Sequence, residues 1–241
     1  MNKKWITPLL AFWLAATAAH LYAGEALDLS GTWQVRLDRQ DVGESEKWWN
    51  QSFAERVQLP GSLTAQGFGD DISTKTPFTI HRQGLPEWLN QSRFEPYRRP
   101  GNIKIPFALQ PEKYYLGAAW YQRAFEVSND WKDKRITLFL ERAHWETTVW
   151  VDGQRIGSHD SLAAPHEYVL PALDPGAHTL TIRVDNRLKY DVGKNAHAVT
   201  DHTQGNWNGI VGKLELRATE QVWIDDVQVF PDAAKKQAEV R

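Results

Sequence analysis

A short polar and aromatic stretch near the carboxyl end of the chain has the residue types that bind sugars. Its members are Asp201, His202, Asn206, Trp207 and Asn208. Sugar binding combines an aromatic ring stacked on the C–H face of the sugar with hydrogen bonds from amides and carboxylates to its hydroxyls. The stretch therefore predicts a sugar-binding loop. The alternative is a turn in which the Asn side chains bond their own backbone and Trp207 packs on the domain edge.

A second polar and aromatic group, Arg142, His144, Trp145 and Glu146, comes just before a hairpin pattern. Its guanidinium and carboxylate also suit hydrogen bonds to sugar hydroxyls. The alternative is a surface pair between Arg142 and Glu146 near strand ends, which would add little stability. The sequence fits both interpretations of this group.

The histidines and acidic pairs do not favour a metal site. The chain has eight histidines and no cysteines. Zinc sites usually show tighter ligand spacing than His197 and His202 offer, together with a third protein ligand. Asp70 and Asp71 are adjacent and could help to hold calcium, although paired acidic residues in loops are usually solvated. We therefore predict no metal and no cofactor.

These candidate residues lie among short segments that predict strands. Trp33, Val35 and Leu37 alternate with polar residues and predict the first strand. The same alternation occurs in two later segments, at Ile136, Leu138 and Leu140 and at Leu180, Ile182 and Val184. No stretch shows a long period of about 3.6 residues. The pattern predicts an all-β fold, a two-sheet sandwich of the jelly-roll type.

Turn residues separate these strands. Asp152-Gly153 suits a two-residue type I′ turn, because both central positions need positive φ. Asp174-Pro175-Gly176 predicts a turn before a strand from His178 to Val184. Two final strands are expected, over 213–218 and over 221–230.

The stretch from Gly61 to Ala118 differs from the rest, because it is rich in glycine, proline and polar residues with scattered aromatics. It predicts a long loop insertion in the sandwich. A loop of this length is more often functional than idle. The alternative is a surface cover that packs its aromatics on the sandwich.

Composition excludes some partners. Lysine plus arginine total 28 against 30 aspartate plus glutamate, which is not the basic excess that nucleic-acid binding needs.

The amino terminus has Lys3 and Lys4, an apolar run over 5–19 and small residues up to Ala23, which predict a secretory signal peptide. The run is interrupted by Pro8 and is shorter than the roughly 20 residues of a membrane span. We expect a secreted or periplasmic protein with no membrane or nucleic-acid partner.

Several ordered motifs resemble the amino-terminal sugar-binding domain of family 2 glycoside hydrolases, the β-galactosidases, β-glucuronidases and β-mannosidases. The motifs are Gly31–Trp33, Leu59–Leu63, Trp120–Arg123, Trp145–His159, Thr179–Asn186 and Asn206–Ile210. The resemblance implies a galactose-binding-domain-like sandwich whose loop at 206–210 reaches toward the active site of a barrel domain. Many members have an acidic sugar contact six positions before the loop glycine, where this chain has Thr203.

The resemblance also bears on catalysis. Glycosidic hydrolysis usually needs two carboxyl groups, about 5 Å apart in retaining enzymes. Family 2 members carry theirs on a downstream barrel of on the order of 250 residues, for which this chain has no room. No Asn-Glu dipeptide, typical of their acid/base glutamate, occurs in the sequence. We therefore assign no catalytic residue to this chain.

Together these patterns divide the chain into three parts. Residues 1–23 are expected to be a signal peptide, 24–219 the sandwich, and 220–241 the first strand of a truncated immunoglobulin-like domain. The strand over 222–231 is expected to lack a partner strand and to be disordered or docked on the sandwich edge. The predicted function is a sugar-binding module that acts on a β-linked glycoside together with downstream domains of the same enzyme. The alternative is an interdomain interaction domain with no ligand.

Overall fold

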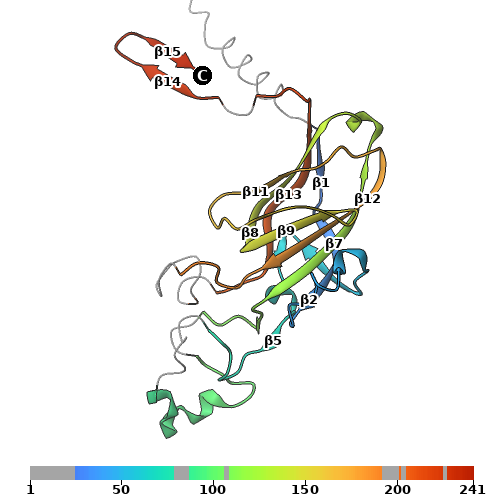
Figure 1. The fold of residues 1–241 in the computed structure, drawn as a ribbon. Helices are drawn as coiled ribbons and strands as arrows, with labels where there is room; N and C mark the ends of the chain where they lie inside the picture. The colour runs from blue at the N-terminus through green and yellow to red at the C-terminus, as the bar shows by residue number, and fades with distance from the viewer. Residues whose placement is uncertain (1–24, 79–86, 106–108, 192–200, 202–204, 225–226) are drawn as a thin grey trace, which may run out of the picture.

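Two antiparallel sheets that face each other across one apolar core make up most of the structure. The computed structural model describes residues 25–78, 87–105, 109–191, 201, 205–224 and 227–241. The five-stranded sheet contains β1 (Glu25–Asp28), β13 (Gly209–Thr219), β8 (Arg135–His144), β11 (His166–Val169) and, beside β13, β4 (Gly61–Ser62). The six-stranded sheet contains β10 (Gln154–His159), β9 (Glu146–Val151), β12 (Gly176–Asp185), β7 (Ala118–Val127), β2 (Gly31–Asp38) and β3 (Glu55–Leu59). Figure 1 shows this sandwich, and the prediction of an all-β jelly-roll fold is confirmed.

The alternating apolar residues of the predicted strands point into the core between the sheets. Leu138 and Leu140 of β8 are fully buried, as are Leu180, Ile182 and Val184 of β12. Each fully buried side chain of this size stabilises the fold by about 1.5–3 kcal/mol. The core therefore fixes the direction of both central strands, and with them the positions of the segments where they end.

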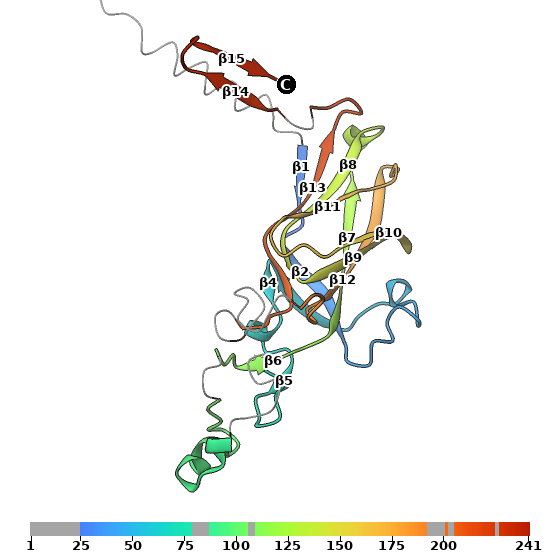
Figure 2. The same ribbon diagram turned by 60° about the vertical axis from the view of Figure 1, so that its left-hand side comes forward.

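Two small elements extend from opposite ends of the sandwich (Figure 2). Within the long insertion, β5 (Asp70–Asp71) pairs with β6 (Lys113–Tyr114). Short 3₁₀ helices lie at η1 (Trp48–Asn50), η2 (Thr64–Gln66), η4 (Glu87–Asn90), η5 (Ser92–Arg98) and η6 (Asn129–Trp131). At the other end, β14 (Val229–Asp232) pairs with β15 (Gln237–Val240).

The aromatics of the insertion divide between two cores. Tyr115 is buried in the main core, as the surface-cover interpretation expects. Phe78 and Tyr114 instead pack on each other at 5.2 Å between ring centroids, in a small core completed by Ile103 and Ile105. The insertion is therefore more than a surface cover, because it has an apolar cluster of its own.

The carboxyl-terminal segment differs from its prediction. We expected strand structure over 221–230 and no partner strand for the segment 222–231, but among the described residues of this segment the strand β14 begins at Val229 and pairs with β15. The expectation of a disordered or edge-docked strand is therefore wrong. A local hairpin satisfies the backbone donors and acceptors that a lone strand would expose. The predicted signal peptide at 1–23 lies outside the described residues, and among those described no helix is long and apolar enough to cross a membrane.

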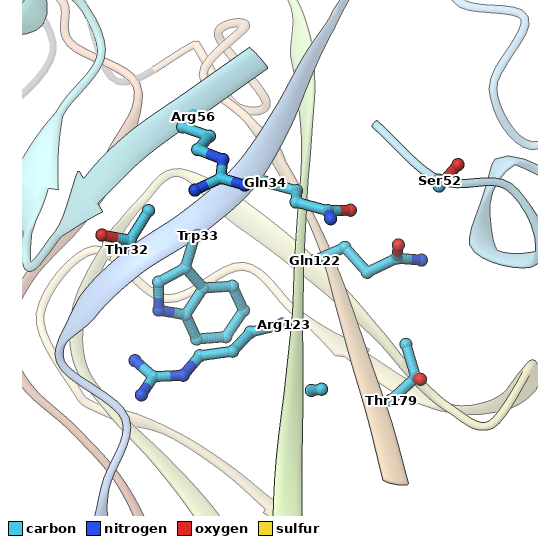
Figure 3. A pocket seen from close by; sticks show the side chains of 9 residues that line it. Thr32, Trp33, Gln34, Ser52, Arg56, Gln122, Arg123 and Thr179 are labelled. Atoms are coloured by element: carbon cyan, nitrogen blue, oxygen red, sulfur yellow. The ribbon is translucent and has the colours of Figure 1, made fainter. Parts of the chain in front are cut away.

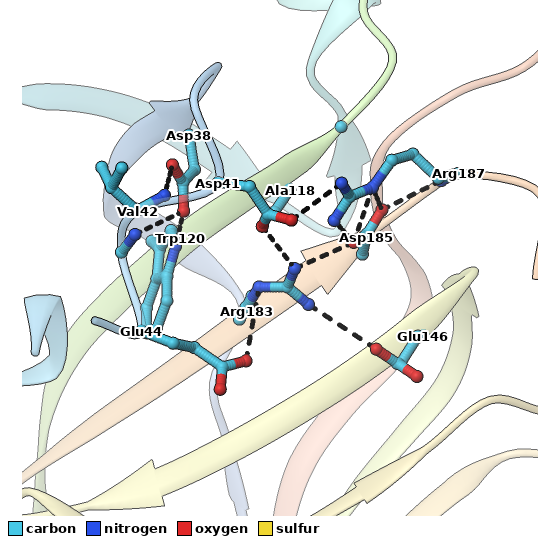
Figure 4. Close-up of polar contacts among 12 residues, drawn as sticks. Asp38, Asp41, Val42, Glu44, Ala118, Trp120, Glu146, Arg183, Asp185 and Arg187 are labelled. Carbon is cyan, nitrogen blue, oxygen red and sulfur yellow. Dashed lines mark hydrogen bonds and ion pairs between the residues drawn. The ribbon is translucent and has the colours of Figure 1, made fainter. Parts of the chain in front are cut away.

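A second apolar cluster covers the outer face of the six-stranded sheet. Trp120 of β7 and Trp150 of β9 form it together with Trp48 and Phe53 of the segment 39–54, which covers this face. The buried Asp38 carboxylate holds this segment down, because it accepts hydrogen bonds from the N–H groups of Val42 (2.9 Å) and Gly43 (2.8 Å) and from the Trp120 indole (3.0 Å). Figure 4 shows these bonds.

Replacing Asp38 with asparagine tests this anchor. The new amide would turn N–H groups toward the N–H donors that Asp38 now satisfies, so we expect the free energy of unfolding to fall by about 2–3 kcal/mol. Urea denaturation would measure the loss, with the exposed Asp130→Asn as the matched control. A loss no larger than that of the control would contradict the assignment.

A single imidazole joins the two predicted turns. Asp152 (φ 49°) and Gly153 (φ 80°) form the predicted turn between β9 and β10. His178 Nδ1 lies 2.6 Å from Asp152 Oδ2, and its Nε2 lies 2.8 Å from the carbonyl oxygen of Asp174. Burial by itself lowers the pKa of His178, but these two acceptors outweigh it and raise that pKa. Both ring nitrogens face acceptors, so the protonated ring satisfies both.

This arrangement predicts a pH-dependent contribution to stability. The pKa of His178 is higher in the folded state than its value of about 6.5 in the unfolded state. Its protonated ring therefore stabilises the fold fully below the unfolded pKa, and this stabilisation is lost as the pH rises through the folded pKa. The loss of unfolding free energy caused by His178→Gln should therefore be larger at about pH 5.5 than at about pH 9. Urea denaturation at both pH values would measure it. The prediction fails if the loss is the same at both, or if an Asp152→Asn background does not reduce its pH dependence.

Candidate functional site

The end of the sandwich where β8 finishes and β13 begins carries an open hollow of ≈ 620 Å³. Gly209 of β13 pairs with His144 of β8, so the residues just before Gly209 lie beside the end of β8. The lining residues are Ser62, Arg142, Ala143, His144, Leu162, Gly205, Trp207 and Val211. Members of both predicted sugar-binding groups, Arg142 and Trp207, therefore line one hollow.

Trp207 is held against His144. The two rings stack with centroids 4.9 Å apart and an angle of 25° between their planes. His144 Nδ1 lies 2.7 Å from the backbone carbonyl oxygen of Trp207. Because a carbonyl only accepts, we assign the proton to Nδ1. Trp207 is half-buried, so part of its indole is open to the hollow.

The other described members of the first group hold the chain around Trp207. Asp201 is buried and accepts the backbone N–H of Asn206 at 2.9 Å. Asn208 donates both amide hydrogens to carbonyl oxygens, of Gly117 and Val184 at 3.0 Å each, and accepts the hydroxyl of Tyr121 at 2.7 Å. His202 lies outside the described residues. Asn208 therefore bonds the backbone of distant segments, and not its own backbone as the turn alternative expects.

Asn206 and Asp201 also border the insertion. Asn206 is buried and donates to the carbonyl of Asn186 at 3.4 Å, and the carbonyl of Asp201 accepts the N–H of Leu109 at 2.6 Å. Burial raises the pKa of the Tyr114 hydroxyl, and the nearby Asp201 charge raises it further. The insertion and the predicted loop are therefore packed together at this end of the sandwich.

The structure separates the members of the second group. Arg142 is exposed at the hollow. Trp145 is buried, and its indole N–H donates to the carbonyl of Asp160 at 2.6 Å. Glu146 lies on the outer face of the six-stranded sheet, where it forms ion pairs with Arg183 (3.6 Å) and Lys189. Glu146 is thus paired with these cations rather than with Arg142, the partner that the alternative interpretation proposed.

Glu146 belongs to a charge network around a buried guanidinium (Figure 4). Arg183 bonds Asp41 and Asp185 at 2.9 Å each and lies 3.7 Å from Glu44. Burial alone would raise the pKa of Asp185, but its bonds from Arg187 and the charge of Arg183 outweigh this and lower it. An adjoining hollow of ≈ 420 Å³ is lined mainly by these charges. Paired buried charges of this kind hold segments in place.

Another hollow, of ≈ 400 Å³, opens on the outer face where β2 and β7 separate (Figure 3). Its polar lining is occupied by contacts within the chain. Gln122 donates to Thr181 at 3.1 Å, Gln34 accepts the N–H of Phe53 at 3.3 Å, and Arg123 bonds the carbonyls of Leu29 and Ser30 at 2.6 Å each. The two bonds from Arg123 hold the chain between β1 and β2, where it crosses from one sheet to the other.

The acidic pair considered for calcium is neutralised by cations. Asp70 pairs with Arg39 at 2.8 Å and Asp71 with Lys113 at 2.6 Å. Across the part of the chain that the structure describes, no three histidine or acidic side chains form a group that could hold a metal.

Sequence reasoning missed Asn186, the residue that follows β12. Its buried amide contacts the chain before β7 and the carbonyl of Trp207. Its position directly after an alternating strand, in the Thr179–Asn186 motif, is the signal that could have drawn attention to it. Ser62 of the hollow likewise lies in the Leu59–Leu63 motif, whereas Leu162 carries no comparable sequence signal.

The fold defines a class, the two-sheet antiparallel β-sandwich. No known family profile matches the chain. A β-glucuronidase from Paenibacillus borealis is 21% identical over 225 residues, covering 86% of this chain and 31% of its own. A β-galactosidase from Thermoanaerobacter pseudethanolicus is 26% identical over 167 residues, covering 64% and 22%. Among solved structures, the Ruminococcus gnavus β-glucuronidase superposes with a TM-score of 0.59 at 17% identity, covering 87% and 31%.

The resemblance to the amino-terminal domain of family 2 glycoside hydrolases is therefore confirmed. The chain spans about a third of the length of the first of these curated relatives.

The different positions of Arg142 and Glu146 predict different effects on stability. Glu146→Gln leaves Arg183 and Lys189 with one fewer counter-charge, so we expect it to lower the free energy of unfolding by about 1 kcal/mol. Arg142→Gln changes an exposed side chain and should alter stability by less than about 0.5 kcal/mol. Urea denaturation of the two variants side by side would measure both. Equal losses of unfolding free energy in the two variants would contradict the assignment of Glu146 to an ion-pair network and of Arg142 to an exposed position.

Proposed function

We propose that this domain supplies one wall of the glycoside-binding pocket of a β-glycosidase, with Trp207 as its main sugar contact. The observation that carries the proposal is the half-buried indole of Trp207 in a hollow at the end of the sandwich. One face of the indole packs on His144, and the exposed part of the ring would contact a sugar.

Polar groups beside the indole fit a sugar. The exposed guanidinium of Arg142 and the hydroxyl of Ser62 line the same hollow. A guanidinium donates to sugar hydroxyls and pairs more strongly with a carboxylate such as that of a uronic acid. Two of the similar proteins are β-glucuronidases, which supports glucuronides as the first substrate class to test.

The reaction served is the hydrolysis of O-glycosyl bonds in carbohydrate metabolism. The two carboxyl groups that such hydrolysis needs would come from another domain of the same enzyme. This domain then acts by binding and orienting the glycoside rather than by breaking the bond. We propose that the protein is exported to the periplasm or the medium, on the basis of the signal-peptide pattern at 1–23.

A specific observation favours a second function, an interdomain contact without a ligand. Large apolar side chains are exposed along the carboxyl-terminal segment: Val222, Trp223, Ile224, Val227, Val229, Phe230 and Val240. Neighbouring exposed apolar residues mark surfaces that another protein surface covers. The sugar titration below distinguishes this function from the first.

The first function predicts weak, Trp207-dependent sugar binding. We expect the purified chain to bind D-glucuronate in about the millimolar range, because a single wall gives only about 4 kcal/mol of binding free energy. Trp207→Ala should abolish that binding. Isothermal titration with glucuronate, galactose and mannose would measure it.

The matched control is Trp223→Ala, which removes a tryptophan that is 44% exposed in the carboxyl-terminal segment. It should leave sugar binding unchanged. If none of the three sugars binds, or if Trp207→Ala binds as well as the original chain, the interdomain function is favoured instead.

A further inference from the structure

The amide of Asn186 joins three segments that meet at the candidate site. Asn186 follows β12 and is 2% exposed. Its Oδ1 accepts the N–H of Gly117 at 2.8 Å, and its Nδ2 donates to the carbonyl oxygens of Tyr115 at 2.8 Å and Trp207 at 3.2 Å. The end of β12, the approach to β7 and the approach to β13 are therefore held by one side chain.

The residue type follows from this set of partners. The site needs two donors and one acceptor within one short planar group, which only an asparagine amide supplies at this length. Aspartate has the same shape but only accepts, and would face two carbonyl oxygens with a buried charge. Glutamine would place the amide one methylene too far from the backbone.

Two donors fix the carbonyl of Trp207. One is Asn186 Nδ2, and the other is His144 Nδ1 at 2.7 Å. On the far side of Trp207, Asn208 is bonded to Gly117 and Val184. The backbone on both sides of the indole is therefore held by asparagine amides, and both amides use Gly117.

We propose that Asn186 is a positioning residue that sets the orientation of the Trp207 indole for sugar contact. It acts through the backbone of Trp207 and does not touch the sugar. The proposal deepens the proposed function and rests on it for the sugar, whereas the orientation of the indole can be measured without any ligand.

Asn186→Asp tests the donor directly. In ¹⁵N-labelled full-length chain, we expect the indole N–H resonance of Trp207, assigned through Trp207→Phe, to shift or broaden. The resonances of Trp33 and Trp120, which are fully buried elsewhere, should stay in place. Glucuronate affinity should fall about tenfold, equivalent to about 1.4 kcal/mol, and Asn186→Asp should cause no further loss in a Trp207→Phe background.

Gln122→Glu is the matched control, because it makes the same amide-to-acid change at a buried position away from Trp207. It should leave the Trp207 resonance and glucuronate binding unchanged. If Asn186→Asp does not fold, Asn186→Ala removes the same donors without adding a charge. An unmoved Trp207 resonance in the folded variant overturns the proposal, as does an equal shift in Gln122→Glu. If the original chain binds no sugar, the proposed function fails while the indole measurement still decides the role of Asn186.

Discussion

The candidate site depends on β12, a central strand that is buried on both faces. Its apolar residues Leu180, Ile182 and Val184 face the core between the sheets. The intervening Thr181 and Arg183 lie under the segment 39–54, where Arg183 bonds Asp41. A shift of β12 by one residue would exchange these two sets and bury the guanidinium in the apolar core, at a prohibitive cost. The position of Asn186 at the end of the strand is therefore fixed by both faces at once.

The second constraint is a close approach of backbones beside Trp207. Gly209 begins β13 with φ +144°, and a Cβ there would lie 2.2 Å from the carbonyl oxygen of Gly61. Only glycine allows β4 to pair with β13 at this point. The pairing brings Ser62 to the hollow that Trp207 lines. A backbone requirement thus determines which side chains meet there.

The charged residues near the site divide by burial. Glu146, Arg183 and Asp185 sit in a paired network on the outer face, where removing one partner leaves another buried charge uncompensated. Arg142 is exposed at the hollow and free of that constraint. The same residue types therefore serve stability on the outer face of the six-stranded sheet and remain accessible to a ligand at the hollow. Under the proposed function, this division leaves Trp207 and Arg142 accessible to a glycoside.

The sequence alone determined the strands, because alternation and turn residues act locally. The alternation in β2, β8 and β12 and the turn at Asp152-Gly153 were predicted correctly, and so were the sandwich and its relationship to family 2 glycosidases. The partner of β14 was not, since strand pairing depends on a segment further along the chain. Tertiary structure alone placed Arg142 and Trp207 in one hollow and Glu146 on the outer face of the six-stranded sheet. It also gave the Asn186 amide its three partners from other segments. Such contacts follow from the register of paired strands, which residues 21 to 71 positions apart decide together.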